Sequence, residues 1–229
     1  MKTIGLLGGM SWESTQLYYR LINEETRRKL GGLHSARIAL VSLDFQEIEI
    51  LQVQGDWATA ADILADAAQR VEKAGADFLL ICTNTMHKVA DEVAAATSIP
   101  LLHIADATAE RIIDSGVTTV GLLGTRFTME QAFYSARLKE RGINVLTPSA
   151  AGRELVHRVI YEELCLGTVK SGSRDAFLEI IDDLVQRGAE AIVEGCTEIG
   201  MLVNEQHTDV TLFDTTRIHA EQAVAIALE

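Results

Sequence analysis

The chain has 229 residues, of which 48% are hydrophobic and 23% charged, a composition typical of a globular α/β protein. Its formal net charge of −13 argues against nucleic acid or an anionic membrane as a partner, because both require a basic surface. No apolar run approaches the roughly 20 residues of a membrane-spanning helix, and the first apolar run is too short for a signal peptide. We therefore expect a cytoplasmic protein.

In the first half of the chain, the patterns predict strands at 2–8, 36–43, 77–82 and 100–105, and helices at 11–30, 57–74 and 84–96. In the second half they predict strands at 120–124, 143–148, 191–195 and 210–213, and helices at about 128–141, 151–165, 173–187 and from about 215. Continuous apolar strands that alternate with helices indicate an α/β fold, in which parallel sheets are covered by helices on both faces.

The two halves match each other in order. GLLGGMS (5–11) resembles GLLGTRF (121–127), KAGADFLLICTNT (73–85) resembles QRGAEAIVEGCTE (186–198), and HIADAT (103–108) resembles TLFDTT (211–216). The repeat predicts a duplication that produced two similar lobes related by a pseudo-twofold axis. We expect the first lobe to contain 1–105 with 212–229, and the second to contain 106–211.

Four turns follow predicted strands and carry polar residues: Gly8–Ser11, Thr83–Thr85, Gly124–Thr125 and Cys196–Glu198. In parallel α/β sheets, ligands bind beyond the carboxyl ends of the strands, where backbone N–H groups of helix N-termini attract carboxylates. Any one Ser, Thr or Asn at such a place can equally be a helix N-cap. Four of them from two related lobes favour an anion-binding cleft between the lobes.

The cysteines differ in their places. Cys82, Cys165 and Cys196 are widely spaced and form no CxxC pair, so the sequence predicts neither a disulfide framework nor a zinc site. Aligning Gly75 with Gly188 places Cys196 opposite Thr83, and Cys82 opposite a glycine. Successive strand residues point in opposite directions. We therefore expect Cys82 to pack in the core and Cys196 to face the cleft, where a helix N-terminus would stabilise its thiolate.

The segments GLLGGMSWEST, CTNTMHK (82–88) and GCTEIG (195–200), in this order, resemble the aspartate/glutamate racemase family over essentially the whole chain. The resemblance implies two similar α/β lobes with the active site between them, a homodimer, and racemisation without pyridoxal phosphate. Most members of the family have Cys where this chain has Thr83. The similarity is greatest to a subgroup that is specific for L-aspartate and L-glutamate and that carries one Thr and one Cys.

From the resemblance, Cys196 is expected to remove the α-proton of the L-enantiomer, and Thr83 to be the weaker acid/base on the opposite face. Asn84, Thr85 and Thr197 are expected to hold the α-carboxylate and amino group of a small acidic amino acid. Met10, Ser11 and Thr125 would line the cleft, Gln52 would add a substrate contact, and Glu198 would orient its neighbours or merely complement the helix dipole.

No cofactor and no metal are expected. His87 and Asp91 are four residues apart on a predicted helix but lack a third ligand, so they are interpreted as a surface pair. Two alternatives stay open: a thiol-dependent hydantoin racemase, decarboxylase or cis–trans isomerase of the same fold, or a non-catalytic module that binds acidic amino acids.

Overall fold

The computed structural model describes residues 1–229, and these residues form two compact units. The first unit comprises Met1–Ile104 and His219–Glu229, and the second comprises Ala105–Ile218. No helix is long and apolar enough to cross a membrane.

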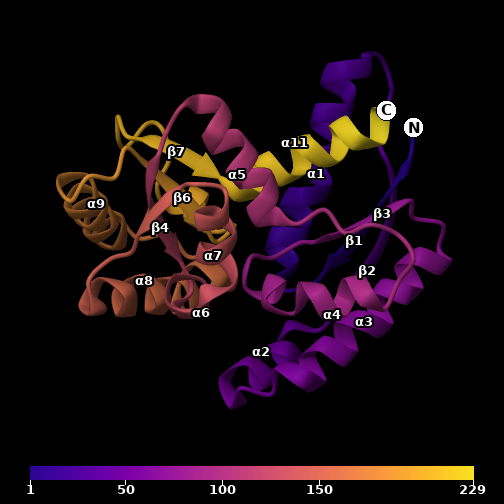
Figure 1. Cartoon of the computed structure of the whole chain (residues 1–229), viewed down its shortest axis with the longest axis horizontal. Coiled ribbons are helices and arrows are strands. Elements are labelled where there is room, and N and C mark those ends of the chain that lie inside the picture. The colour runs from indigo at the N-terminus through magenta and orange to yellow at the C-terminus, as the bar shows by residue number, and fades with distance from the viewer. The chain divides into compact units, whose positions relative to one another are not determined.

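The first unit is built on a three-stranded parallel sheet in the order β2-β1-β3. Its elements are β1 (Thr3–Gly8), α1 (Trp12–Leu30), β2 (Arg37–Ser42), α2 (Phe45–Gln54), α3 (Trp57–Lys73), β3 (Phe78–Ile81), the 3-10 helix η1 (Thr85–Val89), α4 (Ala90–Ala95) and most of α11 (Thr215–Leu228). Alternate strand residues pack on opposite faces of the sheet. Leu6 and Leu80 pack with α1 and α11, whereas Leu7 and Ile81 pack with α2, α3 and α4. Figure 1 shows these helices around the sheet of the first unit.

The second unit is built on a four-stranded parallel sheet in the order β5-β4-β6-β7. Its elements are α5 (Ile104–Ser115), β4 (Thr119–Gly124), α6 (Arg126–Glu130), α7 (Ala132–Glu140), β5 (Asn144–Leu146), α8 (Ala150–Glu162), η2 (Leu164–Leu166), α9 (Ser171–Gln186), β6 (Ala191–Gly195), α10 (Ile199–Leu202) and β7 (Thr211–Asp214). One apolar cluster joins the sheet to α8 and α9 through residues such as Val156, Phe177 and Ile192. Both sheets are thus parallel and flanked by helices, as the alternating pattern predicted.

The two units share one topology, as expected for a duplicated sequence. β1 lies between β2 and β3, and β4 lies between β5 and β6. The same hydrogen bond appears at the start of both sheets: the Asp77 carboxylate accepts from the Thr3 N–H at 2.6 Å, and the Glu190 carboxylate accepts from the Thr119 N–H at 2.9 Å. Two of the sequence matches, 5–11 with 121–127 and 73–85 with 186–198, therefore correspond to equivalent positions in the two sheets.

The structure corrects the expected domain boundary and one of the three matches. Residues 212–218 belong to the second unit, because β7 is hydrogen-bonded to β6. Leu79 and Ile192 occupy equivalent positions, since they pair with the first glycines of the two GLLG motifs. Leu79 is bridged to Leu101 and Ile192 is paired with Leu212, so Leu101 is equivalent to Leu212. The match between 103–108 and 211–216 is therefore out of register.

Several element predictions were also wrong. Residues 100–105 form only an isolated bridge before α5 begins, and α2 and α5 were not predicted as helices. A short apolar run such as LLHIA does not by itself distinguish a buried strand from the start of a helix. The expected helices at 84–96 and 128–141 are each divided, into η1 with α4 and into α6 with α7.

Candidate active site

The turn after β6 contains Cys196, Thr197 and Glu198, all less than 10% exposed. The Cys196 thiol donates a hydrogen bond to Glu198 Oε2, with a sulfur–oxygen distance of 3.0 Å. The Ile199 N–H donates to the Cys196 carbonyl at 3.1 Å and closes the turn. The thiol is thereby fixed beside a carboxylate, at the carboxyl end of the central part of the sheet.

Burial, the negative charge of Glu198 and the nearby Cys165 thiol raise the pKa of Cys196 well above its usual range. This corrects the expectation that a helix N-terminus stabilises the thiolate. The helix that follows, α10, has only four residues and carries a small dipole, and Glu198 brings a full negative charge next to the sulfur. Cys196 is therefore a protonated thiol at rest, and its thiolate would be a strong base.

Two glycines bring β4 and β6 together just before this turn. Gly124 pairs with Gly195, and a Cβ added at Gly124 would lie 2.8 Å from the Gly195 carbonyl oxygen. Thr125, the next residue, is 5% exposed and caps α6, since its hydroxyl accepts from the Thr128 N–H. Thr125 and Cys196 thus follow directly on two paired glycines at the same end of the sheet.

In the first unit, the turns after β1 and β3 carry the equivalent residues. Met10, Ser11, Asn84 and Thr85 are all buried, and Thr83 is partly buried. The Ser11 hydroxyl caps α1 by accepting from the Ser14 N–H at 3.2 Å. Ser11 and Thr125 therefore both serve as helix N-caps, the alternative role that their sequence positions allowed.

Strand register tests the predicted equivalence of Thr83 and Cys196. Leu7 pairs with Ile81 in the first unit, and Leu123 pairs with Glu194 in the second. Because Leu7 and Leu123 occupy the same place in the two GLLG motifs, Thr83 and Cys196 are each the second residue after equivalent strand positions. The alignment made from the glycines agrees with this register.

Cys82 and Cys196 have different surroundings. Cys82 is fully buried in the apolar cluster of β1, β3, α1 and α11, and this burial raises the pKa of its thiol. Its backbone carbonyl accepts from the Ser14 hydroxyl at 2.8 Å. The prediction that Cys82 packs in the core is confirmed.

His87 was predicted to be a surface residue, and the structure shows that this was wrong: it is 3% exposed. Its Nδ1 lies 2.8 Å from the Thr83 carbonyl oxygen, and its Nε2 lies 3.2 Å from the Ile104 N–H. A carbonyl only accepts and an N–H only donates, so His87 is neutral, with its proton on Nδ1. The His87 ring therefore connects the turn that contains Thr83 with Ile104, the first residue of α5. Its spacing of four residues from Thr83 was the signal available in the sequence.

The neighbouring polar side chains also lie near this turn. Gln52, 3% exposed, donates from Nε2 to the sulfur of Met86 at 3.0 Å, which places it beside the Thr83–Thr85 segment. His103 packs with its ring centroid 4.5 Å from that of His87. His219 is held between the Tyr18 hydroxyl and the Leu102 carbonyl, and burial lowers its pKa to about 4.

The predicted site residues therefore form two groups. Each group lies in one unit, at or beside the carboxyl ends of its central strands. The first contains Met10, Ser11, Thr83, Asn84 and Thr85, with Gln52 reaching them from α2, and the second contains Thr125, Cys196, Thr197 and Glu198. Chemically, the second group offers a thiol with a carboxylate partner, and the first offers hydroxyl and amide groups.

Comparison with known proteins places this geometry in a family. The sequence profile described as Asp/Glu/Hydantoin racemase matches residues 7–223. A crystal structure of a putative Asp/Glu racemase from Yersinia pestis is 56% identical, with a TM-score of 0.93 and all of both chains covered. PH1733, an aspartate racemase homologue from Pyrococcus horikoshii OT3, is 33% identical, with a TM-score of 0.87 and all of both chains covered. The broad specificity amino-acid racemase RacX of Bacillus subtilis (strain 168) is 22% identical over 98% of each chain.

Proposed function

The chain belongs to the Asp/Glu/hydantoin racemase family, and from that premise we propose that it racemises L-aspartate and L-glutamate without a cofactor, with Cys196 as the base. The observation that carries this proposal is the buried thiol of Cys196 in hydrogen-bond contact with Glu198. Cys82 packs in an apolar cluster, and Cys165 lies in η2 rather than in a turn that follows a strand.

The first half of the reaction is a proton transfer from Cα to sulfur. The Cys196 thiol loses its proton to Glu198 Oε2, 3.0 Å away, and the thiolate then accepts the α-proton of the L-substrate. Because the pKa of the thiol is raised, only a small fraction of Cys196 is ionised, but the thiolate that forms is a strong base. A strong base suits the weakly acidic Cα–H bond. The carbanion that results places negative charge on the α-carboxylate, and the polar groups of Asn84, Thr85 and Thr197 would stabilise it by hydrogen bonding.

The second half returns a proton to the opposite face of Cα. Thr83 is the position equivalent to Cys196 by strand register, so we assign this step to its hydroxyl. A hydroxyl is a far weaker acid than a thiol. The Thr83 hydroxyl is therefore expected to donate its proton to the carbanion while it takes a proton from water. The reaction is therefore expected to be fast for α-proton removal from the L-form and slow from the D-form.

Solvent-deuterium exchange tests the proposal. Wild-type protein in D2O should exchange the α-proton of L-aspartate and L-glutamate, followed by NMR, and Cys196→Ser should remove almost all of this exchange because an alcohol does not ionise near neutral pH. The matched control is Cys82→Ala, which should lower thermal stability modestly and leave exchange intact. If Cys196→Ser retained more than a few per cent of wild-type exchange (roughly 2 kcal/mol of lost transition-state stabilisation), the thiol mechanism would be wrong.

A thiol-dependent hydantoin racemase, decarboxylase or cis–trans isomerase is the alternative enzyme within this fold. Such an enzyme would give no α-proton exchange with either acidic amino acid, while Cys196→Ser would still abolish its own reaction. A binding module would retain affinity for L-glutamate in the Cys196→Ser variant and show no exchange in the wild type.

A further inference from the structure

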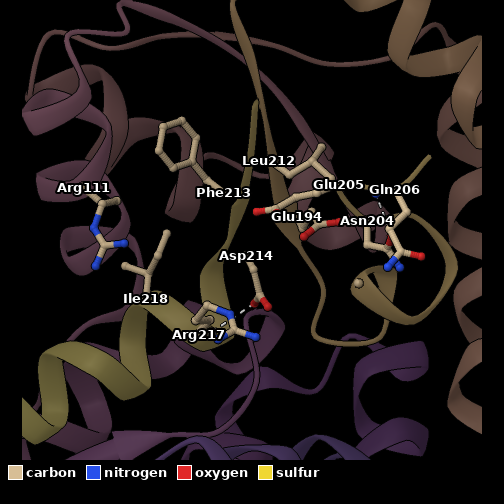
Figure 2. Close-up of a pocket in the computed structure, with 11 residues that line it drawn as sticks. Arg111, Glu194, Asn204, Glu205, Gln206, Leu212, Phe213, Asp214, Arg217 and Ile218 are labelled. Carbon is tan, nitrogen blue, oxygen red and sulfur yellow. Dashed lines mark hydrogen bonds between the residues drawn. The ribbon is translucent and has the colours of Figure 1, made fainter. Parts of the chain in front are cut away.

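The second unit contains a cavity of about 650 Å³ that the racemisation proposal does not use. Its volume is in the range of ligand pockets, about 300–1,000 Å³. We call it the Glu194 pocket (Figure 2). It is lined by residues of α5, β6, α10, the loop after α10, β7 and the first turn of α11: Arg111, Glu194, Gly200, Asn204, Glu205, Gln206, Leu212, Phe213, Asp214, Arg217 and Ile218.

Glu194 is the unusual member of this lining. It stands on β6 between apolar neighbours, its side chain is only 4% exposed, and its Oε1 atom is buried without a hydrogen-bond partner. A buried carboxyl oxygen without a partner is energetically costly, and such groups are rare in folded proteins. The cost indicates that a ligand completes the interactions of Glu194.

A second carboxylate lies beside the first. Asp214 on β7 is the register partner of Glu194 on β6, so the two side chains extend from neighbouring strands on the same face. A Cβ built on Gly200 would lie 3.9 Å from Glu194 Oε2 and 4.0 Å from Asp214 Oδ2. The two carboxylates therefore converge on the space that the absent side chain of Gly200 leaves open. An ammonium group in that space would contact both.

Apart from Glu205, the rest of the pocket lining is basic, polar or apolar. Arg217 on α11 and Arg111 on α5 carry positive charge, and Figure 2 shows them on one side of Asp214, with Asn204 and Gln206 on the other. Leu212, Phe213 and Ile218 add apolar surface. In this structure, no group of three or more His, Cys, Asp or Glu side chains is arranged to hold a metal ion. The lining therefore favours an organic cation that also bears a carboxylate.

We propose that the Glu194 pocket binds a small zwitterion whose ammonium group sits between Glu194 and Asp214 and whose carboxylate faces Arg217. An alkyl chain between the two charged groups packs on the apolar lining. Binding here is separate from racemisation, since neither Cys196 nor Thr83 lines the pocket.

The probe for this proposal is 6-aminohexanoate, which has an ammonium and a carboxylate at opposite ends and no α-amino group, so it is not a racemisation substrate. Titrated into the full isotope-labelled chain and followed by NMR, it should give saturable shifts at the backbone amides of Gly200, Asp214 and Arg217. Hexylammonium should bind more weakly, and hexanoate should bind weakest, because it lacks the group that Glu194 and Asp214 hold.

Three variants separate the contributions. Glu194→Gln should weaken 6-aminohexanoate and hexylammonium about tenfold, whereas Arg217→Gln should weaken only 6-aminohexanoate. Gly200→Ala places a methyl group between the carboxylates at ordinary contact distance and should weaken the binding of both ligands, which keeps the test available if Glu194→Gln folds poorly.

Glu179→Gln, an exposed change on α9 outside the pocket, is the charge-matched control and should bind as the wild type does. Absence of saturable shifts at these amides, or unchanged binding in both Glu194→Gln and Gly200→Ala, would overturn the proposal.

The pH dependence gives a second test. Burial, Asp214 and Glu205 raise the pKa of Glu194 to about 8. An ammonium ligand prefers the ionised carboxylate, so below about pH 8 it must displace a proton and its affinity should fall by up to tenfold per pH unit. The other charged groups that line the pocket are Arg217 from α11 and Arg111 from α5. Wild-type affinity should rise between about pH 6 and pH 8, and the affinity of Glu194→Gln should stay level.

Discussion

Burial and the neighbouring Glu198 carboxylate together raise the pKa of the Cys196 thiol and so the base strength of its thiolate. Glu198 raises the pKa of Cys196 both through its charge and by accepting the thiol proton. A free cysteine in water would ionise more easily, but its thiolate would be a weaker base toward a Cα–H bond. In the proposed reaction, Glu198 therefore lowers the amount of Cys196 thiolate and also raises the base strength of that thiolate.

Replacing Glu198 with Gln should separate these two effects. The change removes a negative charge, so the pKa of Cys196 falls, and the rising limb of the pH–rate profile for α-proton exchange should move to lower pH. The maximal rate should fall by about tenfold, because the thiolate is then a weaker base and its proton acceptor is lost. Alkylation of Cys196 by iodoacetamide, measured over the same pH range, should show the same displacement. A profile that stays in place would show that Glu198 does not control the thiol.

Thr83 sets the expected difference between the two enantiomers. Wild-type protein should exchange the α-proton of L-aspartate and L-glutamate much faster than that of the D-forms, because only a hydroxyl is available on the second face. Thr83→Cys should raise exchange from the D-enantiomers by about tenfold or more, which corresponds to about 1.4 kcal/mol of barrier. The equilibrium between enantiomers stays near unity in both proteins. Equal wild-type rates for both hands would contradict the assignment of Thr83.

At the scale of elements, the turn that joins β1 to α1 depends on Gly9. This residue has a φ of 89°, and a Cβ there would lie 2.1 Å from the Leu43 carbonyl oxygen. Leu43 in turn donates its N–H to the Gly8 carbonyl at 3.0 Å. The turn after β1 therefore packs directly on the backbone after β2, and this packing fixes Met10 and Ser11 at the end of the sheet.

Gly9→Ala should accordingly destabilise the protein severely, by about 3 kcal/mol or more, since it combines a strained φ with a backbone clash. Gly55→Ala is the matched control: Gly55 has a φ of 74°, but an added Cβ meets nothing within 4 Å. That variant should cost only about 1 kcal/mol. Denaturant unfolding measures both, and equal losses of stability would show that the close approach to Leu43 is unimportant.

At the scale of the whole molecule, the family resemblance of the sequence implies a homodimer, and we propose that the chain forms one. Light scattering coupled to size-exclusion chromatography should then give a mass near twice the 25.0 kDa of one chain. Dilution should convert dimer to monomer only at low concentration if the interface is of obligate size. A mass of one chain at every concentration would contradict the proposal.

Much of the architecture was determined by local patterns in the sequence. Apolar runs such as GLLGG and FLLIC, separated by amphipathic helices, identified all seven strands. The signal is clearest for β1, β3, β4 and β6, because a strand buried on both faces reads as one continuous apolar run. The repeated glycines aligned Thr83 with Cys196 correctly, because Gly75 and Gly188 have positive φ at the same turn of both units. A turn that needs a positive φ favours glycine, so this local requirement can be recognised in the sequence.

Other features depended on residues that are distant in the sequence. The pKa of Cys196 is raised by burial under α8, α9 and their neighbours, which no window around GCTEIG contains. The buried ring of His87 contacts the backbone of Ile104, which is 17 positions away in the chain, as well as that of Thr83. Glu194 and Asp214 converge only because β6 pairs with β7. The sequence by itself determined which residues stand at the ends of the strands; only the tertiary structure decided their ionisation and partners, because both depend on which distant groups replace water around them.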